Sequence, residues 1–437
     1  MLIEMTFENF RSFKERQTFS MLPINKFKEL KSNIAQIEGN DLLRSAVIYG
    51  KNASGKSNIL LAFKAISFMV SRSFEFKRER PIPIYEPFLM DSSSANANVF
   101  FEVLFFGKNK VKYKYSIEFS KTIVHRETLY HYPKGQPALI FERILNDIKE
   151  GDPVKGELQA INKRLYENQL LLSKASIENI DAINEPFLFF QKYLFAFTIN
   201  NTCDACDKMM IDIHAANLYK KEKPHLLDAV NKLIRESDTG IKEIYIKENK
   251  EEDFKFPESI SEERRKQIVE SNKYQVFAKH MLFDKGTAIG ETQLDIEDES
   301  AGTTKIFTVG GLILDALSDG SVFLIDELDR SLHPHLSKII VQLFNNPETN
   351  PKNAQLIFTS HNTSLLSNDL FRRDQIWFTE KDDKGCSTFY TLGDLKGVRK
   401  DVPYEKYYHN GLFGGIPNLN LYNFFSELQT NEQEITK

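Results

Sequence analysis

Residues 44–57 read RSAVIYGKNASGKS, and this segment is the strongest indication of the chain's architecture. RSAVIYG is a short apolar run that predicts a strand, and NILLAFKAISFMV, which follows the loop, has apolar residues at helical spacing. The loop fits the pattern G-x-x-x-x-G-K-[ST], in which successive backbone N–H groups and the start of a helix surround a phosphate. The sequence therefore predicts a strand, a phosphate-binding loop and a helix, as in P-loop α/β folds.

Two side chains of this loop are the first candidates for chemistry. Lys56 is expected to reach the β- and γ-phosphates of a bound nucleotide. The hydroxyl of Ser57 is expected to bind Mg²⁺, a cation that prefers oxygen ligands. The loop thus predicts a nucleotide site that takes a metal ion with its phosphates.

A second strand is predicted in VFLIDELDRSLHP, residues 322–334. Its four apolar residues deliver Asp326 and Glu327 to the carboxyl edge of the sheet, where ligands bind in open α/β folds. We expect Asp326 to hold Mg²⁺ in its outer shell and Glu327 to polarise the attacking water. The alternative is that two acids after a strand simply cap the next loop.

A third strand, in AQLIFTSH, residues 354–361, presents His361 at the same edge. An imidazole titrates near neutral pH, so it can stabilise or sense a γ-phosphate. The alternative is a histidine that serves only as a structural hydrogen-bond partner. The chain order of Lys56, Asp326 with Glu327, and His361 favours the functional interpretation.

Hydrophobic periodicity divides the chain into three parts. Residues 1–132 contain the phosphate loop and then alternate with period two from Val99 to Tyr132, which predicts antiparallel strands. Residues 133–285 are charge-rich and are expected to form a mainly helical insertion. Residues 286–437 return to alternating helices and buried strands, which is typical of a parallel sheet covered on both faces.

Composition limits the classes of function. The 437 residues carry a formal net charge of −4, so no overall positive field attracts nucleic acid. Basic clusters at 71–80 and 262–267 are interpreted as solvated faces. Three cysteines are too few for a disulfide framework, and neither a signal peptide nor a membrane-length apolar run is present. We expect a cytoplasmic protein without membrane contact.

Together these motifs resemble the ABC-type ATPase heads of the SMC, Rad50 and RecF group. The resemblance is carried by FENFRSF at the N-terminus, GKNASGKSN as Walker A, FLIDELD as Walker B and TSH as the switch histidine. Within that group the chain is most similar to bacterial anti-phage ATPases of the AbiLi/RloA abortive-infection type. The supporting stretches are YEPFLMD (85–91), ESAGTTK (299–305), DELDRSLHP (326–334) and EKYYHNGLFGGIPNL (405–419).

The resemblance implies an ABC-ATPase head with an antiparallel β subdomain and a helical insertion, which binds ATP and Mg²⁺ and hydrolyses ATP to ADP and phosphate. It implies catalytic roles for Glu327 and His361, and Mg²⁺ binding by Ser57 and Asp326. The nucleotide-binding residues that it implies are Gly50, Asn52, Gly55, Lys56, Ser57, Asn58, Ser300 and Gly302.

Ser300 and Gly302 stand where ABC heads carry their signature motif, at the start of a helix that precedes Walker B. Such a helix of about 16 residues spans roughly 24 Å, which returns the chain to the sheet edge of Asp326 but displaced sideways. We therefore expect this turn to face a nucleotide held by a second copy of the chain. The alternative is an ordinary serine helix cap.

Two departures from the ABC pattern stand out. The usual signature is Leu-Ser-Gly-Gly-Gln/Glu, whereas ESAGT keeps the serine and one glycine. The expected glutamine between Walker A and the signature has no clear counterpart, and Glu86 is the nearest candidate.

Cys203 and Cys206 form one CxxC motif, as in a zinc hook. A zinc hook needs a long coiled coil, which the sequence does not show, so we expect a reduced pair of cysteines.

The resemblance also implies a biological role. It is that of a sensor and switch in abortive infection, acting as a homodimer or higher oligomer and controlling a separately encoded effector, such as an RloB- or Toprim-type nuclease. One alternative is a RecF- or SMC-like ATPase that binds DNA in repair or maintenance. Another is an assembly protein that binds ATP without turnover, against which Glu327 argues.

Overall fold

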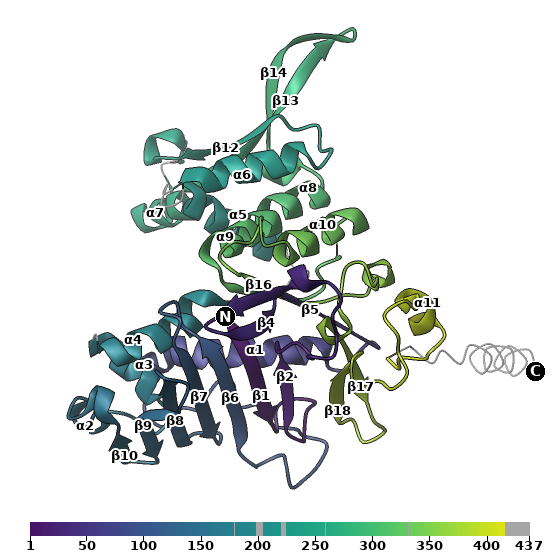
Figure 1. The fold of residues 1–437 in the computed structure, drawn as a ribbon. Helices are drawn as coiled ribbons and strands as arrows, with labels where there is room; N and C mark the ends of the chain where they lie inside the picture. The colour runs from purple at the N-terminus through teal and green to yellow at the C-terminus, as the bar shows by residue number, and fades with distance from the viewer. Residues whose placement is uncertain (179, 198–203, 220–223, 258, 331, 416–437) are drawn as a thin grey trace, which may run out of the picture.

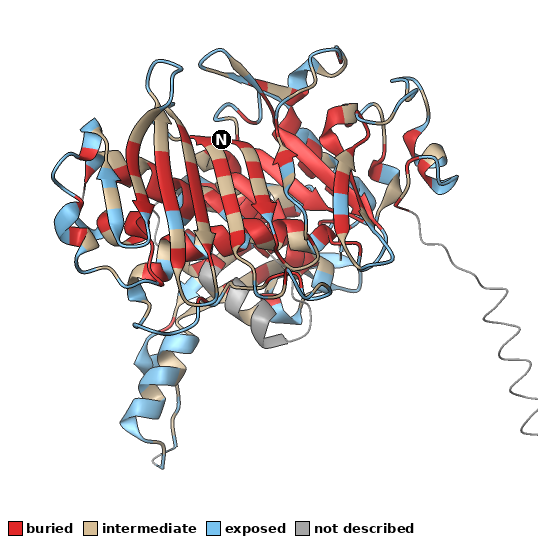
Figure 2. Ribbon diagram, turned by 90° about the horizontal axis from the view of Figure 1, so that it is seen from below, coloured by how far each residue is buried: buried red, intermediate tan, exposed pale blue. Residues whose placement is uncertain are grey.

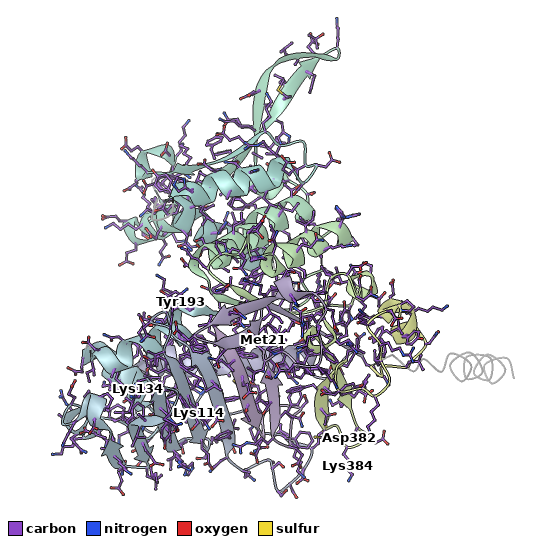
Figure 3. All side chains as sticks on the ribbon, in the orientation of Figure 1. Met21, Lys114, Lys134, Tyr193, Asp382 and Lys384 are labelled. Atoms are coloured by element: carbon purple, nitrogen blue, oxygen red, sulfur yellow. The ribbon has the colours of Figure 1, made fainter. Side chains whose placement is uncertain are left out.

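The computed structural model describes residues 1–178, 180–197, 204–219, 224–257, 259–330 and 332–415. Its lower half in Figure 1 contains a large antiparallel sheet beside a parallel sheet, and its upper half contains helices and a projecting hairpin. Figure 3 shows Lys114 on the antiparallel sheet, and Asp382 with Lys384 at the turn that joins two strands of the parallel-sheet side. Among the described residues, no helix is long and apolar enough to cross a membrane.

The antiparallel sheet has seven strands in the order β10-β9-β8-β7-β6-β1-β2. In β6 most alternate side chains are buried, the pattern expected of a sheet with one face on the core and the other toward water. The expected strands between Val99 and Tyr132 are therefore confirmed. The strands are β1 (Leu2–Glu8), β2 (Gln17–Ser20), β6 (Val99–Phe106), β7 (Lys112–Phe119), β8 (Val124–Tyr132), β9 (Ala138–Ile144) and β10 (Asp147–Glu150).

The second sheet has six strands in the order β11-β15-β16-β5-β17-β18 and is parallel except for β18. Its strands β5, β15 and β16 are buried along their whole length. Figure 2 shows in red that buried residues gather in the centre of the molecule. The strands are β5 (Ser45–Gly50), β11 (Leu194–Phe197), β15 (Val322–Ile325), β16 (Gln355–Thr359), β17 (Ile376–Lys381) and β18 (Ser387–Thr391).

Two hydrophobic cores lie on the two faces of this parallel sheet. Val322 and Leu324 of β15 belong to the core that also contains α1 (Lys56–Arg72). Phe323 and Ile325 of the same strand belong to the core with α9 (Gly311–Asp319) and α10 (Pro334–Asn345). Both side-chain faces of the strand are covered, which explains why its sequence is continuously apolar.

The upper half in Figure 1 is built from helices and a three-stranded sheet, β12-β13-β14. The hairpin of β13 (Tyr274–Asp284) and β14 (Thr287–Asp295) extends away from the helices. The other elements here are α5 (Asp204–Tyr219), α6 (Pro224–Arg235), β12 (Glu243–Glu248), α7 (Glu262–Ser271) and α8 (Ala301–Lys305). Small elements elsewhere are β3 (Ile34–Ile37), β4 (Asn40–Leu43), α2 (Gln159–Asn162), α3 (Leu171–Ala175), α4 (Asp181–Leu188) and α11 (Tyr404–His409).

Residues 133–285 differ from the expected mainly helical insertion, because strands are interspersed with the helices. β9 and β10 extend the antiparallel sheet, β11 adds an edge to the parallel sheet, and β12 and β13 pair with each other. β11 has only four residues, and its partner β15 lies far along the chain, so no local pattern marks it. The boundaries at 132 and 285 remain predictions.

Candidate nucleotide site

Three neighbouring strands bring the predicted residues to one edge of the parallel sheet. β15, β16 and β5 are adjacent and parallel, so their carboxyl ends meet. Asp326 and Glu327 follow β15, Ser360 and His361 follow β16, and the phosphate loop follows β5 at Gly50. The sequence order alone did not require these strands to be neighbours.

The ammonium group of Lys56 lies inside the phosphate loop. Its Nζ donates to the backbone carbonyls of Gly50 at 2.9 Å and Lys51 at 3.0 Å, and the residue is 7% exposed. Burial lowers the pKa of Lys56, while the negative charges of Asp326 and Glu327 act in the opposite direction. The lysine thus holds a position from which a phosphate can replace neutral carbonyls as its partner.

The glycines of the loop are required by close packing. A Cβ atom at Gly50 would lie 2.3 Å from Thr379 Oγ1 of β17, and one at Gly55 would lie 2.7 Å from Ser387 Oγ of β18. Gly55 also has φ of 109°, a conformation that side chains rarely adopt. The neighbouring strands β17 and β18 therefore support the loop. Asn52 and Ser57 of the loop are exposed.

Asn58, in the first turn of α1, is held by the N-terminal FENFRSF segment. Its Nδ2 donates to Ser12 Oγ at 2.8 Å, and its Oδ1 lies 3.4 Å from Arg11 Nη1. Arg11 also binds Glu86 through two N–H groups, one of them an Nη2–Oε1 contact of 3.0 Å. Glu86, the nearest candidate for the missing glutamine, thus connects to the loop helix through Arg11.

One threonine links the two acidic residues. The Thr359 hydroxyl, on fully buried β16, donates to Asp326 Oδ1 and accepts from the backbone N–H of Glu327 at 2.7 Å. Glu327 has φ of 52°, in the left-handed region where residues other than glycine are uncommon. Strained backbone held in place by its surroundings is often found at functional sites, so this conformation supports a role beyond capping.

The carboxylate of Glu327 lies between the side chains of Arg330 and His361. Arg330 Nη1 binds its Oε2 at 2.9 Å, and His361 Nε2 lies 3.9 Å from its Oε1. The imidazole of His361 is about half exposed and lies on the side of this carboxylate. The two predicted catalytic side chains therefore face each other at an open sheet edge.

The Ser300 turn is separate from this cluster in the single chain. Ser300 Oγ accepts from the backbone N–H of Thr303 at 3.1 Å, which is the helix-cap interaction of the alternative interpretation. Ser300 is exposed, and within the described part of the chain no hydrogen bond or ion pair joins Ser300 or Gly302 to the phosphate loop. The helix runs from α8 through a π-helical turn at 306–310 into α9, and Gly320 is its C-cap.

The CxxC pair lies largely outside the described residues. Cys203 and the side chain of Cys206 are not described, so the expected reduced pair stays a prediction. His214, which lies in α5 after this pair, is 2% exposed, and its ring packs against Phe307 with centroids 5.1 Å apart. Within the described ranges, no group of three or more His, Cys, Asp or Glu side chains is placed to hold a metal.

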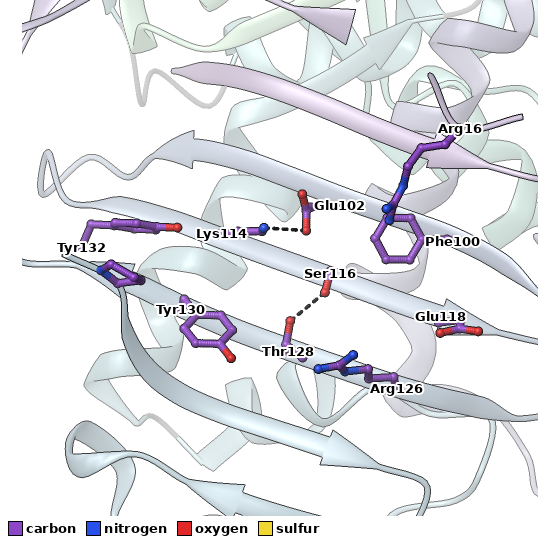
Figure 4. Close-up of a pocket in the computed structure, with 11 residues that line it drawn as sticks. Arg16, Phe100, Glu102, Lys114, Ser116, Glu118, Arg126, Thr128, Tyr130 and Tyr132 are labelled. Carbon is purple, nitrogen blue, oxygen red and sulfur yellow. Dashed lines mark hydrogen bonds and ion pairs between the residues drawn. The ribbon is translucent and has the colours of Figure 1, made fainter. Parts of the chain in front are cut away.

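A hollow of about 470 Å³ lies on the outer face of the antiparallel sheet, away from the phosphate loop (Figure 4). Arg16 lies over the ring of Phe100 at 4.2 Å, and Lys114 binds Glu102 at 2.9 Å. Arg126 also has a carboxylate partner, Glu142. Because its cations are paired with acids, this hollow offers little net positive charge to a phosphate backbone.

Residues 45–367 match the family described as AAA domain, putative AbiEii toxin, Type IV TA system. The match runs from β5 to the loop after His361 and covers most of the chain. The chain belongs to this family. It is therefore an ATPase, as the sequence motifs predict, and the family carries the AbiEii label rather than the AbiLi/RloA label of the resemblance.

Solved structures with a related arrangement are distant in sequence. The SMC head domain from Thermotoga maritima is 12% identical, covers 89% of this chain and 98% of its own, and gives a TM-score of 0.40. The Smc head domain with an extended coiled coil, bound to the C-terminal domain of ScpA derived from Pyrococcus furiosus, is 13% identical. It covers 89% of this chain and 96% of its own, and gives a TM-score of 0.39. The recombination mediator protein RecF with ATP is 14% identical, covers 89% of this chain and 97% of its own, and gives a TM-score of 0.36. No curated protein matches the chain.

Sequence reasoning missed several residues of this candidate site. Thr359 could have been found, because it ends the strand that delivers His361 and so reaches the same edge. Arg11 stands in the FENFRSF motif, but its contacts with Asn58 and Glu86 join segments that lie 47 and 75 positions apart in the chain. Arg330 follows Glu327 by three residues, a spacing that can pair side chains in a turn.

Proposed function

We propose that this ATPase binds Mg²⁺–ATP between two copies of the chain and hydrolyses it to switch a separate effector in abortive-infection defence against phage. The observation that carries the proposal is the convergence of Lys56, Glu327 and His361 at the carboxyl edge of three adjacent strands. A phosphate-binding lysine and a residue that orients the attacking water recur in ATPase sites, and a nearby histidine can stabilise charge on the γ-phosphate.

The first chain supplies the phosphate grip. Lys56 leaves the carbonyls of Gly50 and Lys51 to bind the β- and γ-phosphates, and the loop amides with Gly55 surround the charge. Ser57, exposed at the start of α1, and Asp326 fit Mg²⁺, because both present oxygen atoms. Thr359 occupies one Asp326 oxygen and leaves the other for the metal or its water.

Hydrolysis is assigned to Glu327 and His361. Glu327 polarises the attacking water, and His361 stabilises charge that develops on the γ-phosphate. The Arg330 contact occupies Glu327 Oε2 in the chain described here, while Oε1 faces His361. A water bound between Oε1 and the phosphate would therefore meet both groups.

The second chain supplies Ser300 and the amides around Gly302. The turn is exposed and has no contact with its own phosphate loop among the described residues, which fits a contact made in trans. Closure of two heads on ATP, and opening after hydrolysis, would give the switch two states. The family description and the abortive-infection resemblance support a defence role with a separately encoded effector, such as a Toprim-type nuclease.

The test is Mg²⁺-dependent ATP hydrolysis by the purified chain and two variants. We expect Glu327→Gln to keep ATP binding and to lower kcat by about 10²–10⁴, the range for loss of a general base. Lys56→Ala is expected to abolish ATP binding and ATP-dependent dimers together. Hydrolysis that is unchanged in Glu327→Gln would refute the assigned chemistry.

The competing RecF- or SMC-like function predicts DNA binding. Titration of duplex DNA at increasing salt would show it as a steep loss of affinity, because each released counterion contributes to the slope. We expect weak binding without ATP dependence. Tight, ATP-dependent and salt-sensitive binding would favour the DNA function over control of an effector.

A further inference from the structure

The loop that carries His361 is tied to the turn after Glu327 and to the phosphate-loop strand. The backbone N–H of His361 faces both carboxylate oxygens of Asp329 at 3.4 Å. The next residue, Asn362, accepts a hydrogen bond of 2.9 Å at its carbonyl oxygen from the hydroxyl of Tyr49. Tyr49 immediately precedes Gly50, so one side chain spans the distance between the phosphate loop and the histidine loop.

Tyr49 is suited to this role because it is buried and remains a donor. The residue is 1% exposed, and burial raises the pKa of its phenol, so the hydroxyl keeps its proton. Its ring lies in an aromatic cluster, with its centroid 6.4 Å from that of Phe378 and 5.9 Å from that of Tyr408. A ring enclosed in this way holds its hydroxyl in one place.

Helix α11 completes the attachment of the histidine loop. The hydroxyl of Thr363, two residues after His361, donates to Glu405 Oε1 at 2.8 Å and lies 3.1 Å from His409 Nε2. Tyr408 of the same helix packs on the Tyr49 ring. Residues 361, 362 and 363 are thus each held by a different part of the structure. The attachment of Asn362 is made by a buried side chain, that of Tyr49.

We propose that Tyr49 is a positioning residue for ATP hydrolysis, whose hydroxyl holds the His361 loop so that the imidazole meets the γ-phosphate beside Glu327. The inference rests on the proposed ATPase site and adds a residue that acts through His361. Loss of the hydroxyl would leave the Asn362 carbonyl without its partner and would allow the loop to shift. Nucleotide affinity, which depends on Lys56 and the loop amides, would change little.

The experiment measures kcat and KM for ATP in wild type, Tyr49→Phe and a matched control, Tyr113→Phe. The Tyr113 hydroxyl is also hydrogen-bonded, to Asn109 at 2.8 Å, but lies on β7 of the antiparallel sheet. We expect Tyr49→Phe to lower kcat about five- to ten-fold with KM changed less than about two-fold, as for loss of one hydrogen bond in the transition state. Tyr113→Phe should match wild type.

A double-mutant cycle separates positioning from general destabilisation. In a His361→Ala background, Tyr49→Phe should have no further effect on kcat, because the group it positions is gone. An unchanged kcat in Tyr49→Phe, or an equal loss in both backgrounds, would overturn the inference while leaving the ATPase site intact. A wild type without Mg²⁺-dependent hydrolysis would instead overturn the proposed function, and the inference with it.

A second pair of variants covers the case in which Tyr49→Phe does not fold. Thr363→Val removes both contacts with α11 at a partly exposed position, and Thr363→Ser keeps the hydroxyl. Positioning of the loop predicts a lower kcat for Thr363→Val and recovery in Thr363→Ser. Equal kcat values for Thr363→Val and wild type would then count as the contrary result.

Discussion

Glu127 and Arg143 form the most completely buried ion pair of the antiparallel half. Their side chains are 0% and 2% exposed, and Glu127 also accepts from the hydroxyl of Tyr115 at 2.9 Å and from the backbone N–H groups of Leu171 and Leu172. Burial raises the pKa of Glu127, whereas Arg143 and the hydrogen-bond donors lower it. The charged form of Glu127 therefore depends on these partners. The pair joins β8 and β9 to α3.

Removal of one partner is therefore expected to be costly. Glu127→Gln should lower the free energy of unfolding by about 3–5 kcal/mol, because the Arg143 charge stays buried without its acid. Glu142→Gln, which breaks the more exposed pair with Arg126, should cost less than about 1 kcal/mol. Urea unfolding of both variants measures the difference, and equal losses would contradict the account of the buried pair.

His214 predicts a pH dependence of stability. Burial lowers its pKa to about 4, compared with 6.5 when it is exposed. Between these values the unfolded chain binds a proton that the folded chain does not, so stability falls as the pH decreases through this window. From pH 7 to pH 5 the loss should be about 2 kcal/mol, and His214→Leu should remove it. If wild type and His214→Leu lose the same free energy of unfolding between pH 7 and pH 5 in urea titrations, His214 is not the group responsible.

At the level of elements, β15 and β16 act as one unit through Thr359. Thr359→Val removes the donor to Asp326 and the acceptor of the Glu327 N–H in one substitution of similar shape. We expect kcat to fall about ten-fold or more and half-maximal activity to require more Mg²⁺. Thr359→Ser should retain the wild-type kcat and Mg²⁺ requirement. If Thr359→Val keeps both as well, the Thr359 hydroxyl does not connect the two strands functionally.

The motifs on continuous elements could be predicted from sequence. β5 with its loop and α1, β15 with its acids, and β16 with its histidine each combine an apolar run with adjacent polar residues, so local pattern is sufficient. Contacts between distant segments could not be predicted. β11 pairs with β15 across a long separation, and Tyr49 reaches Asn362 only because β5 and β16 are neighbours. Local periodicity contains no information on such pairings.

At the scale of the whole molecule, the proposed dimer divides each ATP site between two chains. The phosphate loop, Glu327 and His361 would form the first half-site, and the Ser300 turn would form the second. A symmetric dimer would bring each first half-site to the second half-site of its partner, which closes two ATP sites at once. ATP hydrolysis would then be shared between chains, and each chain alone would be nearly inactive.

A mixture of two inactive variants tests whether the ATP site forms between two chains. Lys56→Ala lacks a phosphate grip, and Ser300→Arg blocks the turn, so each alone should be inactive. A mixed dimer keeps one intact site, so an equal mixture should regain about a quarter of the wild-type activity if pairing is random. A mixture as inactive as its components would show that the site does not form between chains.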